Sequence, residues 1–492
     1  MNHIPGPLLL PPLLPMTETG GGSDPAPVPA SAGPWQAGPA ARIAAVVAAA
    51  LMLTWPAFWN GFPLVFADSG TYLGQALRIY LGWDRPPFYS LFLLATHWRL
   101  TLWGPVLVQG FIVAHLLSLV LRALGRPNPW LLLPVAGALA VLTGLPWVTA
   151  QLIPDVFTGV LVLALWLLGF RAAVLSRGER LWLLLLATAC TAFHQSHLPL
   201  ALGLAGVASG LLLVWRGRGA ALLAGVRMAA PVLFAALALT AVNFAGHGRA
   251  SPSPFGSVFL ATRLIFDGPG MDLLRRRCPE EGWRVCPVLD RLGAHHNIFL
   301  WEPTSPLWTD LGGPKTWARE ASAIVGAVLR EAPGAVAAGV FSNTLEQFRL
   351  LDTGDGLEPW PGVPGPEPLI AEFFPQELER YRADRQQHGA LLADAKAIAP
   401  LHRIVALAGL MALLLVPVLG RRRLGLAGVG LVVLVLAAGI GNAAITGGLS
   451  GPAVRYQARL AWLFAFAPLA LALGATAAVP SVGQSVQHRR AA

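Results

Sequence analysis

Ten segments of the chain are long and apolar enough, or nearly so, to cross a lipid bilayer as helices, and no other feature limits the fold as strongly. A spanning helix needs roughly 20 mostly apolar residues. The apolar runs are continuous and do not alternate, which favours helices over a transmembrane barrel. The sequence therefore predicts an all-α polytopic membrane protein with about 10 transmembrane helices. The predicted spans are 41–59, 104–121, 130–150, 156–175, 180–194, 198–215, 226–245, 401–420, 424–446 and 459–479.

The composition excludes the other common classes of protein. Among the 492 residues, 55% are hydrophobic and only 12% are charged, whereas a soluble domain carries about 25% charged residues. The high hydrophobicity also argues against a disordered chain, and three cysteines are too few for a disulfide-based scaffold.

The net charge of +10 is distributed unevenly along the chain. Residues 246–400 contain 19 of the 25 acidic residues but only 15 of the 35 Lys and Arg, so the remainder is strongly basic. Short basic loops between membrane helices account for this excess, and the charge therefore does not predict a nucleic-acid partner.

Four short basic loops set the predicted topology, because cytoplasmic loops carry an excess of Lys and Arg. With ten spans, all four loops and both termini lie on the cytoplasmic side. Residues 86–98 are also apolar, but an eleventh span would break this arrangement, so they are predicted to form an interfacial helix on the outer face. The basic loops contain Arg122 and Arg126, Arg171, Arg177 and Arg180, Arg216, Arg218 and Arg227, and Arg421, Arg422 and Arg423.

The residue usage bears on the location of the protein. Lysine occurs only at positions 315 and 396, whereas Arg, Ala, Gly, Leu and Pro are abundant. This bias is typical of a GC-rich bacterial genome. The sequence therefore predicts a multi-pass protein of the bacterial inner (plasma) membrane with cytoplasmic N- and C-termini.

The topology divides the chain into five parts. Residues 1–40 are rich in Pro, Gly and Ser, which predicts a disordered cytoplasmic tail. Residues 41–245 form a membrane domain of seven spans, and its first outer loop covers residues 60–103. Residues 246–400 are a mixed outer (periplasmic) segment, 401–479 hold three more spans, and 480–492 are a second cytoplasmic tail.

Cys278 and Cys286 lie in the outer segment with seven residues between them. An oxidising periplasm allows a disulfide between them. They are therefore a candidate disulfide pair.

Polar residues at the membrane edges converge on the predicted outer face. The topology was derived from the basic loops alone, so this clustering is an independent observation. Ionisable groups that meet at one membrane face indicate a functional site. The residues are Asp68, Asp84, Arg85, Asp155, His194, His197, Arg455 and Arg459.

The first outer loop contains two short motifs in order. The stretch Asp68-Ser69-Gly70-Thr71-Tyr72 opens a predicted surface helix that runs to about residue 81, and Arg85-Pro86-Pro87-Phe88-Tyr89 opens the next one. Two interpretations remain open for each charged residue. Asp68 either acts in catalysis or caps the surface helix, and Arg85 either binds a ligand or extends to the lipid headgroups.

These motifs resemble those of the GT-C superfamily of membrane glycosyltransferases, the group that contains protein O-mannosyltransferases and the aminoarabinose transferase. Those enzymes carry an acidic motif in the first outer loop, then a Tyr, then a Lys/Arg-Pro-Pro-apolar-Tyr element. The resemblance is strongest over about residues 40–215. The family usually shows a pair of acids, whereas here Asp68 is followed by Ser69 and Gly70.

The resemblance implies a GT-C-like fold and an inverting transfer of a sugar from a polyprenyl-phosphate donor to a lipid, glycan or protein acceptor. Asp68 would be the base, and Tyr72, Arg85 and Tyr89 would contact the substrate. The cofactor is left open between a divalent metal ion and none, because the second acid is missing from the loop. No Gly-rich nucleotide loop is evident in the sequence, and the expected partners are the lipid-linked donor, the acceptor and membrane lipids.

Five more residues are assigned to substrate binding. Arg455 and Arg459 at the outer end of the last span are phosphate candidates. Asp155 either supplies the second carboxylate of the site or simply interacts favourably with the positive N-terminal end of the next helix. His194 and His197 either face one ion or phosphate or stabilise a helix turn by hydrogen bonds.

Two other functions compete with the transferase. A transporter or flippase of lipid-linked sugars should place ionisable residues near the bilayer midplane, in two matching halves. The charges lie at helix ends instead, and Gln109 and His115 are the main strongly polar residues within the spans, which favours chemistry at the membrane surface. A catalytically inactive member of the fold is the third interpretation, because fold does not determine function.

Overall fold

The computed structural model describes residues 38–419 and 421–475, and the elements named below lie within these ranges. The predicted tail at 480–492 lies outside them, as does the predicted tail at 1–40 except for its last three residues. The first helix begins at Pro39.

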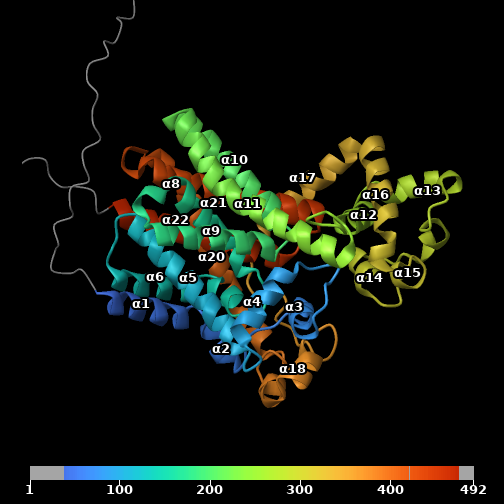
Figure 1. The fold of residues 1–492 in the computed structure, drawn as a ribbon, viewed down its shortest axis with the longest axis horizontal. Coiled ribbons are helices and arrows are strands. Elements are labelled where there is room, and N and C mark those ends of the chain that lie inside the picture. The colour runs from blue at the N-terminus through green and yellow to red at the C-terminus, as the bar shows by residue number, and fades with distance from the viewer. Residues whose placement is uncertain (1–37, 420, 476–492) are drawn as a thin grey trace, which may run out of the picture. The chain divides into compact units, whose positions relative to one another are not determined.

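The described residues form helices joined by turns, and the only strand-like contact among them is a bridge between Leu64 and Gln151. Figure 1 follows the helices in chain order. The N-terminal helices are α1 (Pro39–Met52), α2 (Trp55–Asn60), α3 (Ala67–Arg78), α4 (Pro87–His97), α5 (Trp103–Ala123), α6 (Leu132–Leu142), α7 (Leu145–Thr149), α8 (Val156–Phe170), α9 (Arg177–Phe193), α10 (His197–Arg216) and α11 (Arg218–His247).

The remaining helices cover the predicted outer segment and the last membrane helices. Short 3₁₀ turns separate some of them. The helices are α12 (Gly256–Asp267), α13 (Gly270–Glu281), α14 (His296–Trp301), α15 (Pro306–Thr309), α16 (Gly313–Glu331), α17 (Pro333–Arg349), α18 (Glu367–Phe373), α19 (Leu378–Arg382), α20 (Ala390–Leu419), α21 (Arg421–Leu449) and α22 (Val454–Ala475). The 3₁₀ turns are η1 (Pro129–Leu131), η2 (Ala172–Val174), η3 (Cys286–Arg291) and η4 (Pro375–Glu377).

Six described helices are long and apolar enough to cross a bilayer, so the chain is a polytopic helical membrane protein. These are α5, α10, α11, α20, α21 and α22. The number rises to seven if α16 and α17, which meet at 101°, count as one broken span. The other four predicted spans contain helices too, but each is shorter than 18 residues.

Proline and glycine explain two of the shorter segments. The predicted span 41–59 is divided between α1 and α2, with Pro56 in the first turn of α2. The predicted span 130–150 is divided between α6 and α7 after Gly144, with Pro146 in the first turn of α7. Proline lacks the N–H that a continuous helix needs, so each helix ends before it. The predicted interfacial segment 86–98 forms α4, which begins at Pro87 as the Pro-Pro pair indicates.

The predicted outer segment 246–400 contributes to two different hydrophobic cores. Residues between Phe255 and Val328 build a core of their own, called the second core below, in which Trp317 is buried. Residues between Leu351 and Ala395 instead pack into the main core of the membrane helices. Between these two parts, α17 packs along α21. The expected mixed segment is therefore helical with irregular connections.

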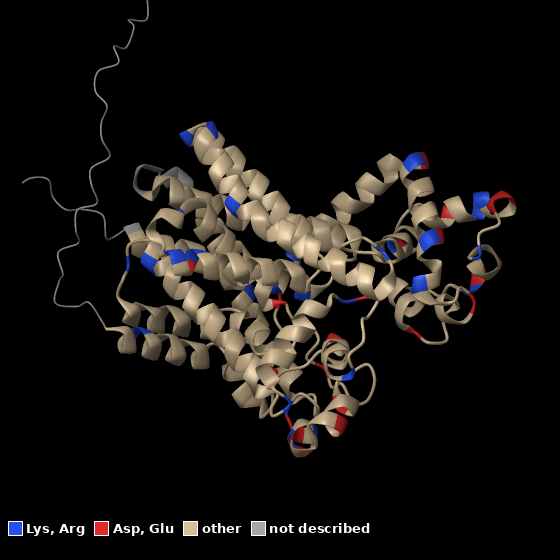
Figure 2. Ribbon diagram, in the orientation of Figure 1, with Lys and Arg blue, Asp and Glu red and all other residues tan. Residues whose placement is uncertain are grey.

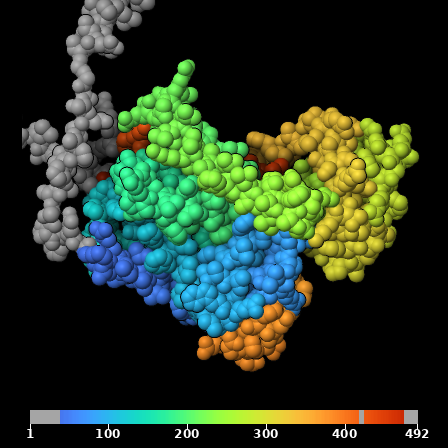
Figure 3. Space-filling view, viewed as in Figure 1, coloured from blue at the N-terminus to red at the C-terminus, as the bar shows by residue number. Residues whose placement is uncertain are grey.

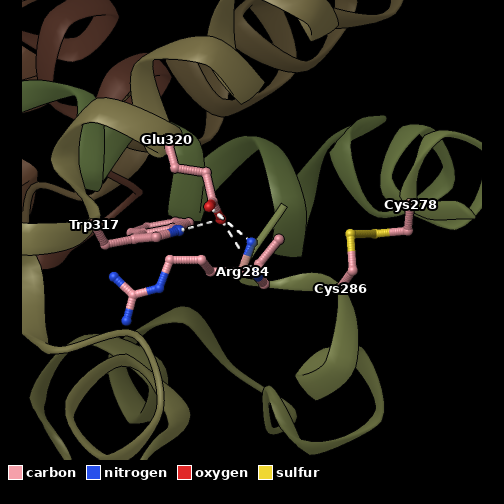
Figure 4. Close-up of a disulfide and its surroundings, with 6 residues drawn as sticks. Cys278, Arg284, Cys286, Trp317 and Glu320 are labelled. Atoms are coloured by element: carbon pink, nitrogen blue, oxygen red, sulfur yellow. Dashed lines mark hydrogen bonds between the residues drawn. A yellow bond between two sulfur atoms is a disulfide. The ribbon is translucent and has the colours of Figure 1, made fainter. Parts of the chain in front are cut away.

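The disulfide between Cys278 and Cys286 joins the end of α13 to the start of η3, as the sequence predicted. Glu320 of α16 binds the loop that the disulfide closes. Its carboxylate accepts hydrogen bonds from the backbone N–H groups of Arg284 and Val285 and from the indole N–H of Trp317, at 2.8, 3.0 and 3.0 Å (Figure 4). The loop is thus attached to the second core by a covalent and a polar link.

Charged residues are concentrated outside the apolar helices. Figure 2 shows them gathered over α12–α16 and around α18, while most turns of the long helices carry none. The segment 350–390 lies against the predicted first outer loop, where α18 packs on α3 (Figure 3). Gln386 links this segment to the loop, because its side chain forms hydrogen bonds with both the N–H and the C=O of Val65.

Candidate functional site

Ser69 positions the start of α3. Its hydroxyl accepts a hydrogen bond from the Phe66 N–H and donates one to the Leu152 carbonyl, each at 3.0 Å. The bridge between Leu64 and Gln151 lies directly beside this contact. The predicted first outer loop is therefore attached to the turn that precedes α8, which brings the region of Asp68 close to that of Asp155.

Gly70 is needed because another chain segment approaches it closely. A Cβ at this position would lie 2.4 Å from the carbonyl oxygen of Pro364 and 3.0 Å from that of Gly365. Ser69 and Gly70 thus have structural roles here, at the positions where the family that the motif resembles usually shows a second acid.

The carboxylate of Asp68 lies between two arginines. The Nη2 atom of Arg85 is 2.8 Å from Oδ1, and the Nη2 atom of Arg455 is 3.0 Å from Oδ2. All three side chains are less than one-fifth exposed. The interpretation of Asp68 as a helix cap is wrong, because Phe66 is the N-cap and Asp68 is already the second residue of α3.

The two arginines determine the charge of Asp68. Burial raises its pKa, but the charges of Arg85 and Arg455 outweigh burial and hold this pKa down to about 2. The carboxylate is therefore ionised at neutral pH. Arg85 binds this acid and does not simply extend to the lipid headgroups.

Aromatic rings support both guanidinium groups. Arg455 lies over Phe66 at 4.2 Å and over Tyr456 at 5.0 Å from the ring centres, and Arg85 lies 5.7 Å from the centre of Trp301. Such contacts hold a cation in place without neutralising it. Since Trp301 ends α14, the predicted outer segment reaches the cluster of Asp68, Arg85 and Arg455.

A second ion pair lies one helical turn further along α22. The Nη1 atom of Arg459 is 3.1 Å from Oδ1 of Asp155, and both side chains are almost completely buried. Arg459 also donates to Asn442 at 2.8 Å and to Ser196 at 3.1 Å. The Asp155 side chain makes no capping bond to α8, so its carboxylate serves the ion pair.

The two histidines do not form a common ligand site. His197 uses both ring nitrogens inside the protein, with Nδ1 2.6 Å from the Cys190 carbonyl and Nε2 2.7 Å from the Thr158 hydroxyl. His194 lies outside the helix, and its Nδ1 bonds Ser196 at 2.8 Å. His197 therefore joins α8 and α9 by hydrogen bonds, and its assignment to substrate binding stays a prediction.

The two predicted tyrosines pack against each other with ring centres 5.0 Å apart. The hydroxyl of Tyr89 donates to Gln109 at 2.7 Å, and the Gln109 amide donates to the carbonyls of Thr149 and Gln151. Tyr89 therefore stabilises the structure beneath the site and has no free hydroxyl for a substrate. Tyr72 is buried, and its hydroxyl has no partner within the described part of the chain.

Three further atoms of the site share this property. In the part of the chain that the structure describes, the buried atoms Arg85 Nε, Asp155 Oδ2 and Arg459 Nε also lack a hydrogen-bond partner. Buried polar atoms in proteins are nearly always hydrogen-bonded, and exceptions mark places where water or a ligand binds. These atoms and the Tyr72 hydroxyl are thus available to a polar ligand.

The site does not suit a divalent metal ion. Both oxygens of Asp68 face guanidinium groups, which repel a second cation. Within residues 38–419 and 421–475, no group of three or more His, Cys, Asp and Glu is arranged to hold a metal.

The space beside Arg455 is small. A cavity of about 20 Å³ lies between Trp147, Gln151, Asp355 and Arg455. This volume holds a single water molecule and not a sugar. A larger ligand must displace the segment near Asp355, whose carboxylate accepts the backbone N–H of Arg455 at 2.8 Å.

Sequence reasoning missed several residues that complete the site. They are Phe66, Ser196, Asp355, Asn442 and Tyr456. Asn442 had a detectable signal, because it is a strongly polar residue within the apolar stretch 424–446. The other four had none, since their roles depend on contacts between distant segments.

Comparisons with protein-family models, with curated proteins and with solved structures find no match for this chain.

Proposed function

We propose that this membrane protein is a glycosyltransferase of the GT-C type, which moves a sugar from a polyprenyl-phosphate donor to an acceptor at the outer face of the membrane. In this proposal the four shorter apolar segments also cross the bilayer, which gives the ten spans inferred from the sequence. The basic loops then lie in the cytoplasm, and the Asp68 site lies on the opposite side.

The observation that carries the proposal is the position of Asp68 between Arg85 and Arg455. A sugar transfer from a phosphate needs a carboxylate to accept the proton of the acceptor hydroxyl. It also needs cations for the phosphate that leaves. Asp68 is one of only four acids in the described chain outside residues 246–400, and it lies within 3.0 Å of two arginines.

The transfer is a single displacement. The acceptor oxygen bonds to the anomeric carbon of the sugar while the bond from that carbon to the phosphate oxygen breaks. The acceptor proton passes to Asp68, and the electron pair leaves with the polyprenyl phosphate, which Arg85 and Arg455 hold by charge-assisted hydrogen bonds. Configuration at the anomeric carbon is inverted, as in other one-step reactions of this kind.

Donor binding would also activate the base. With a pKa of about 2, Asp68 is ionised but binds a proton weakly while both arginines contact it. A phosphate that takes over part of those contacts lowers the positive charge around the carboxylate. The pKa of Asp68 then rises toward its ordinary value, and its ability to accept a proton rises with it.

In this proposal the pair of Asp155 and Arg459 forms part of the same site. The free oxygen of Asp155 and the hydroxyl of Tyr72 are buried without a partner among the described residues, so both suit the hydroxyl groups of a sugar. Arg459 neutralises Asp155 and keeps that carboxylate in place.

The test is transfer or hydrolysis of synthetic polyprenyl-phosphate-linked hexoses and pentoses by purified protein in lipid nanodiscs. We expect Asp68→Asn to lower turnover by about 100-fold or more, the size typical of a lost general base. Asp84→Asn is the matched control, because Asp84 is near Arg85 at 4.0 Å but does not touch Arg455. It should retain activity.

The other outcomes separate the competing functions. Absence of turnover in the wild-type protein, with equal donor binding by all variants, would contradict the enzyme and leave an inactive member of the fold. Movement of a labelled donor across the membrane of sealed vesicles, without transfer, would identify a transporter instead.

A further inference from the structure

A cavity lies at the ends of α1 and α5 that are remote from Asp68. Its volume is about 330 Å³, against about 20 Å³ beside Arg455. It lies between the start of α1, the C-terminal half of α5, the turn at 126–129 and Glu179 of α9. A volume of this size is at the lower end of the range for small-ligand sites.

The polar part of this cavity is positively charged. Arg42, Arg122 and Arg126 line it, and Glu179 is the only acid that does so. Glu179 is already engaged, because it lies 2.6 Å from Nη2 of Arg122. The balance of charge in the cavity therefore favours an anion.

The apolar part leads from the cavity along the outside of two helices. Ile43 and Phe111 line the cavity, and each begins an exposed row of large apolar residues. Ile43, Val47 and Leu51 follow one face of α1, and Phe111 and Leu107 follow one face of α5. These spacings of four place each row on one side of its helix, where lipid chains are expected to lie.

A ligand that fits both parts has a compact anionic head and apolar chains. We propose that this cavity binds the phosphate headgroup of an anionic phospholipid, whose acyl chains lie along the exposed rows of α1 and α5. Basic pockets between membrane helices bind such headgroups, and the positive-inside rule places this one in the cytoplasmic leaflet. The bound lipid would join α1, α5 and α9, because the lining comes from all three. The proposal does not depend on the glycosyltransferase activity.

The test is titration of the full-length protein, in neutral detergent, with fluorescent phosphatidylglycerol and with phosphatidylcholine of the same chain length. Two variants change the cavity in different ways. Arg42→Gln removes a charge from an exposed side chain, and Ser118→Leu fills part of the cavity that Ser118 lines. Arg216→Gln is the matched control, since Arg216 is an exposed arginine at the end of α10 and lies outside the cavity.

We expect Arg42→Gln to weaken phosphatidylglycerol binding roughly five-fold, which is the usual effect of one basic residue near a lipid headgroup. Ser118→Leu should weaken it further, while Arg216→Gln should bind like the wild type. Phosphatidylcholine should bind more weakly than phosphatidylglycerol to the wild-type protein.

Three results would overturn the proposal. Equal affinities for Arg42→Gln, Ser118→Leu and Arg216→Gln would show that lipid binds to the surface in general. Equal affinity for the two lipids would exclude recognition of an anionic headgroup. Displacement of the lipid by an equal concentration of inorganic phosphate would show a site for free anions. Thermal unfolding of each variant identifies any loss of binding that results from misfolding.

Discussion

Arg455 follows Asp68 by 387 positions in the chain, yet its Nη2 atom lies 3.0 Å from Oδ2 of that carboxylate. This contact joins the last described helix, α22, to the start of α3. Arg85 binds the other oxygen of Asp68, and Asp355 accepts the backbone N–H of Arg455. Two segments far apart in the chain therefore meet at the Asp68 carboxylate, and a third, at Asp355, contacts the backbone of Arg455.

The first prediction concerns Arg455. If it holds the donor phosphate, Arg455→Gln should lower kcat/KM for the polyprenyl-phosphate donor by about 10- to 100-fold, the usual value of a hydrogen bond to a charged group. Arg455→Lys should lose less, because it keeps the charge but not the planar guanidinium. Steady-state kinetics at several donor concentrations measure both effects.

Arg403 provides the control for this prediction. It is half-exposed, and its Nη1 atom is 3.7 Å from the carboxylate of Asp352. An Arg403→Gln variant with the same kinetic loss as Arg455→Gln would show that general charge, and not the contact with Asp68, is responsible.

The buried pair of Asp155 and Arg459 gives a prediction for stability. Asp155→Asn leaves the charge of Arg459 without its partner in a buried position, which should cost about 3–5 kcal/mol. The double variant Asp155→Leu, Arg459→Met removes both charges and should recover part of this loss. Thermal unfolding in detergent measures both variants.

The exposed pair of Arg78 and Glu372 is the matched comparison. Both side chains are about half-exposed, so Glu372→Gln should cost no more than about 1 kcal/mol. Equal losses for Asp155→Asn and Glu372→Gln would contradict the importance of burial.

Asp384 predicts a pH dependence of stability. It is 3% exposed, and burial raises its pKa from 3.8 to about 7. Between these two values the folded protein binds a proton that the unfolded chain has released, so this group favours folding at acidic pH and its contribution is lost as the pH rises toward 7. The loss amounts to roughly 4 kcal/mol at most.

Unfolding of wild-type and Asp384→Asn protein at pH 5 and pH 8 tests this prediction. The variant does not titrate, so the difference in stability between the two pH values should be smaller than in the wild type. Asp272→Asn, at an exposed position of α13, should behave like the wild type. The same pH difference in all three proteins would contradict the prediction.

The disulfide should stabilise the second core, which is formed by residues between Phe255 and Val328. Replacing Cys278 and Cys286 by Ser should lower its stability by about 2–3 kcal/mol, as expected for a short closed loop. Limited proteolysis should then cut within residues 255–328 at a lower temperature. A reducing agent should produce the same change in the wild-type protein and in Cys190→Ser, because Cys190 is not bonded.

Gly70 and Gly326 are both helical glycines with different surroundings. A methyl group at Gly70 would meet the Pro364 carbonyl, whereas one at Gly326 has open space. Gly70→Ala should therefore destabilise the protein by about 1–3 kcal/mol. Gly326→Ala should stabilise it by up to about 1 kcal/mol. Unfolding measurements on the two variants check the opposite signs.

Local properties of the sequence were sufficient to predict much of the architecture. The length of the apolar runs identifies a helical membrane protein, and the Pro-Pro pair at 86–87 marks the start of α4. The first-loop motif and the charges at the membrane edges identified five residues that the structure brings into two groups. Asp68 lies with Arg85 and Arg455, and Asp155 lies with Arg459. These features depend on residue type and short spacing alone.

The pairing of those charges could be decided only by the tertiary structure. Asp68 accepts a hydrogen bond from Arg455, and Asp155 accepts one from Arg459. The two partners are more than 300 positions apart in each case. The same holds for His197, whose two nitrogens bond residues of the neighbouring helices α8 and α9. A sequence shows that a polar group must be satisfied when it is buried, but the packing of distant helices determines which partner satisfies it.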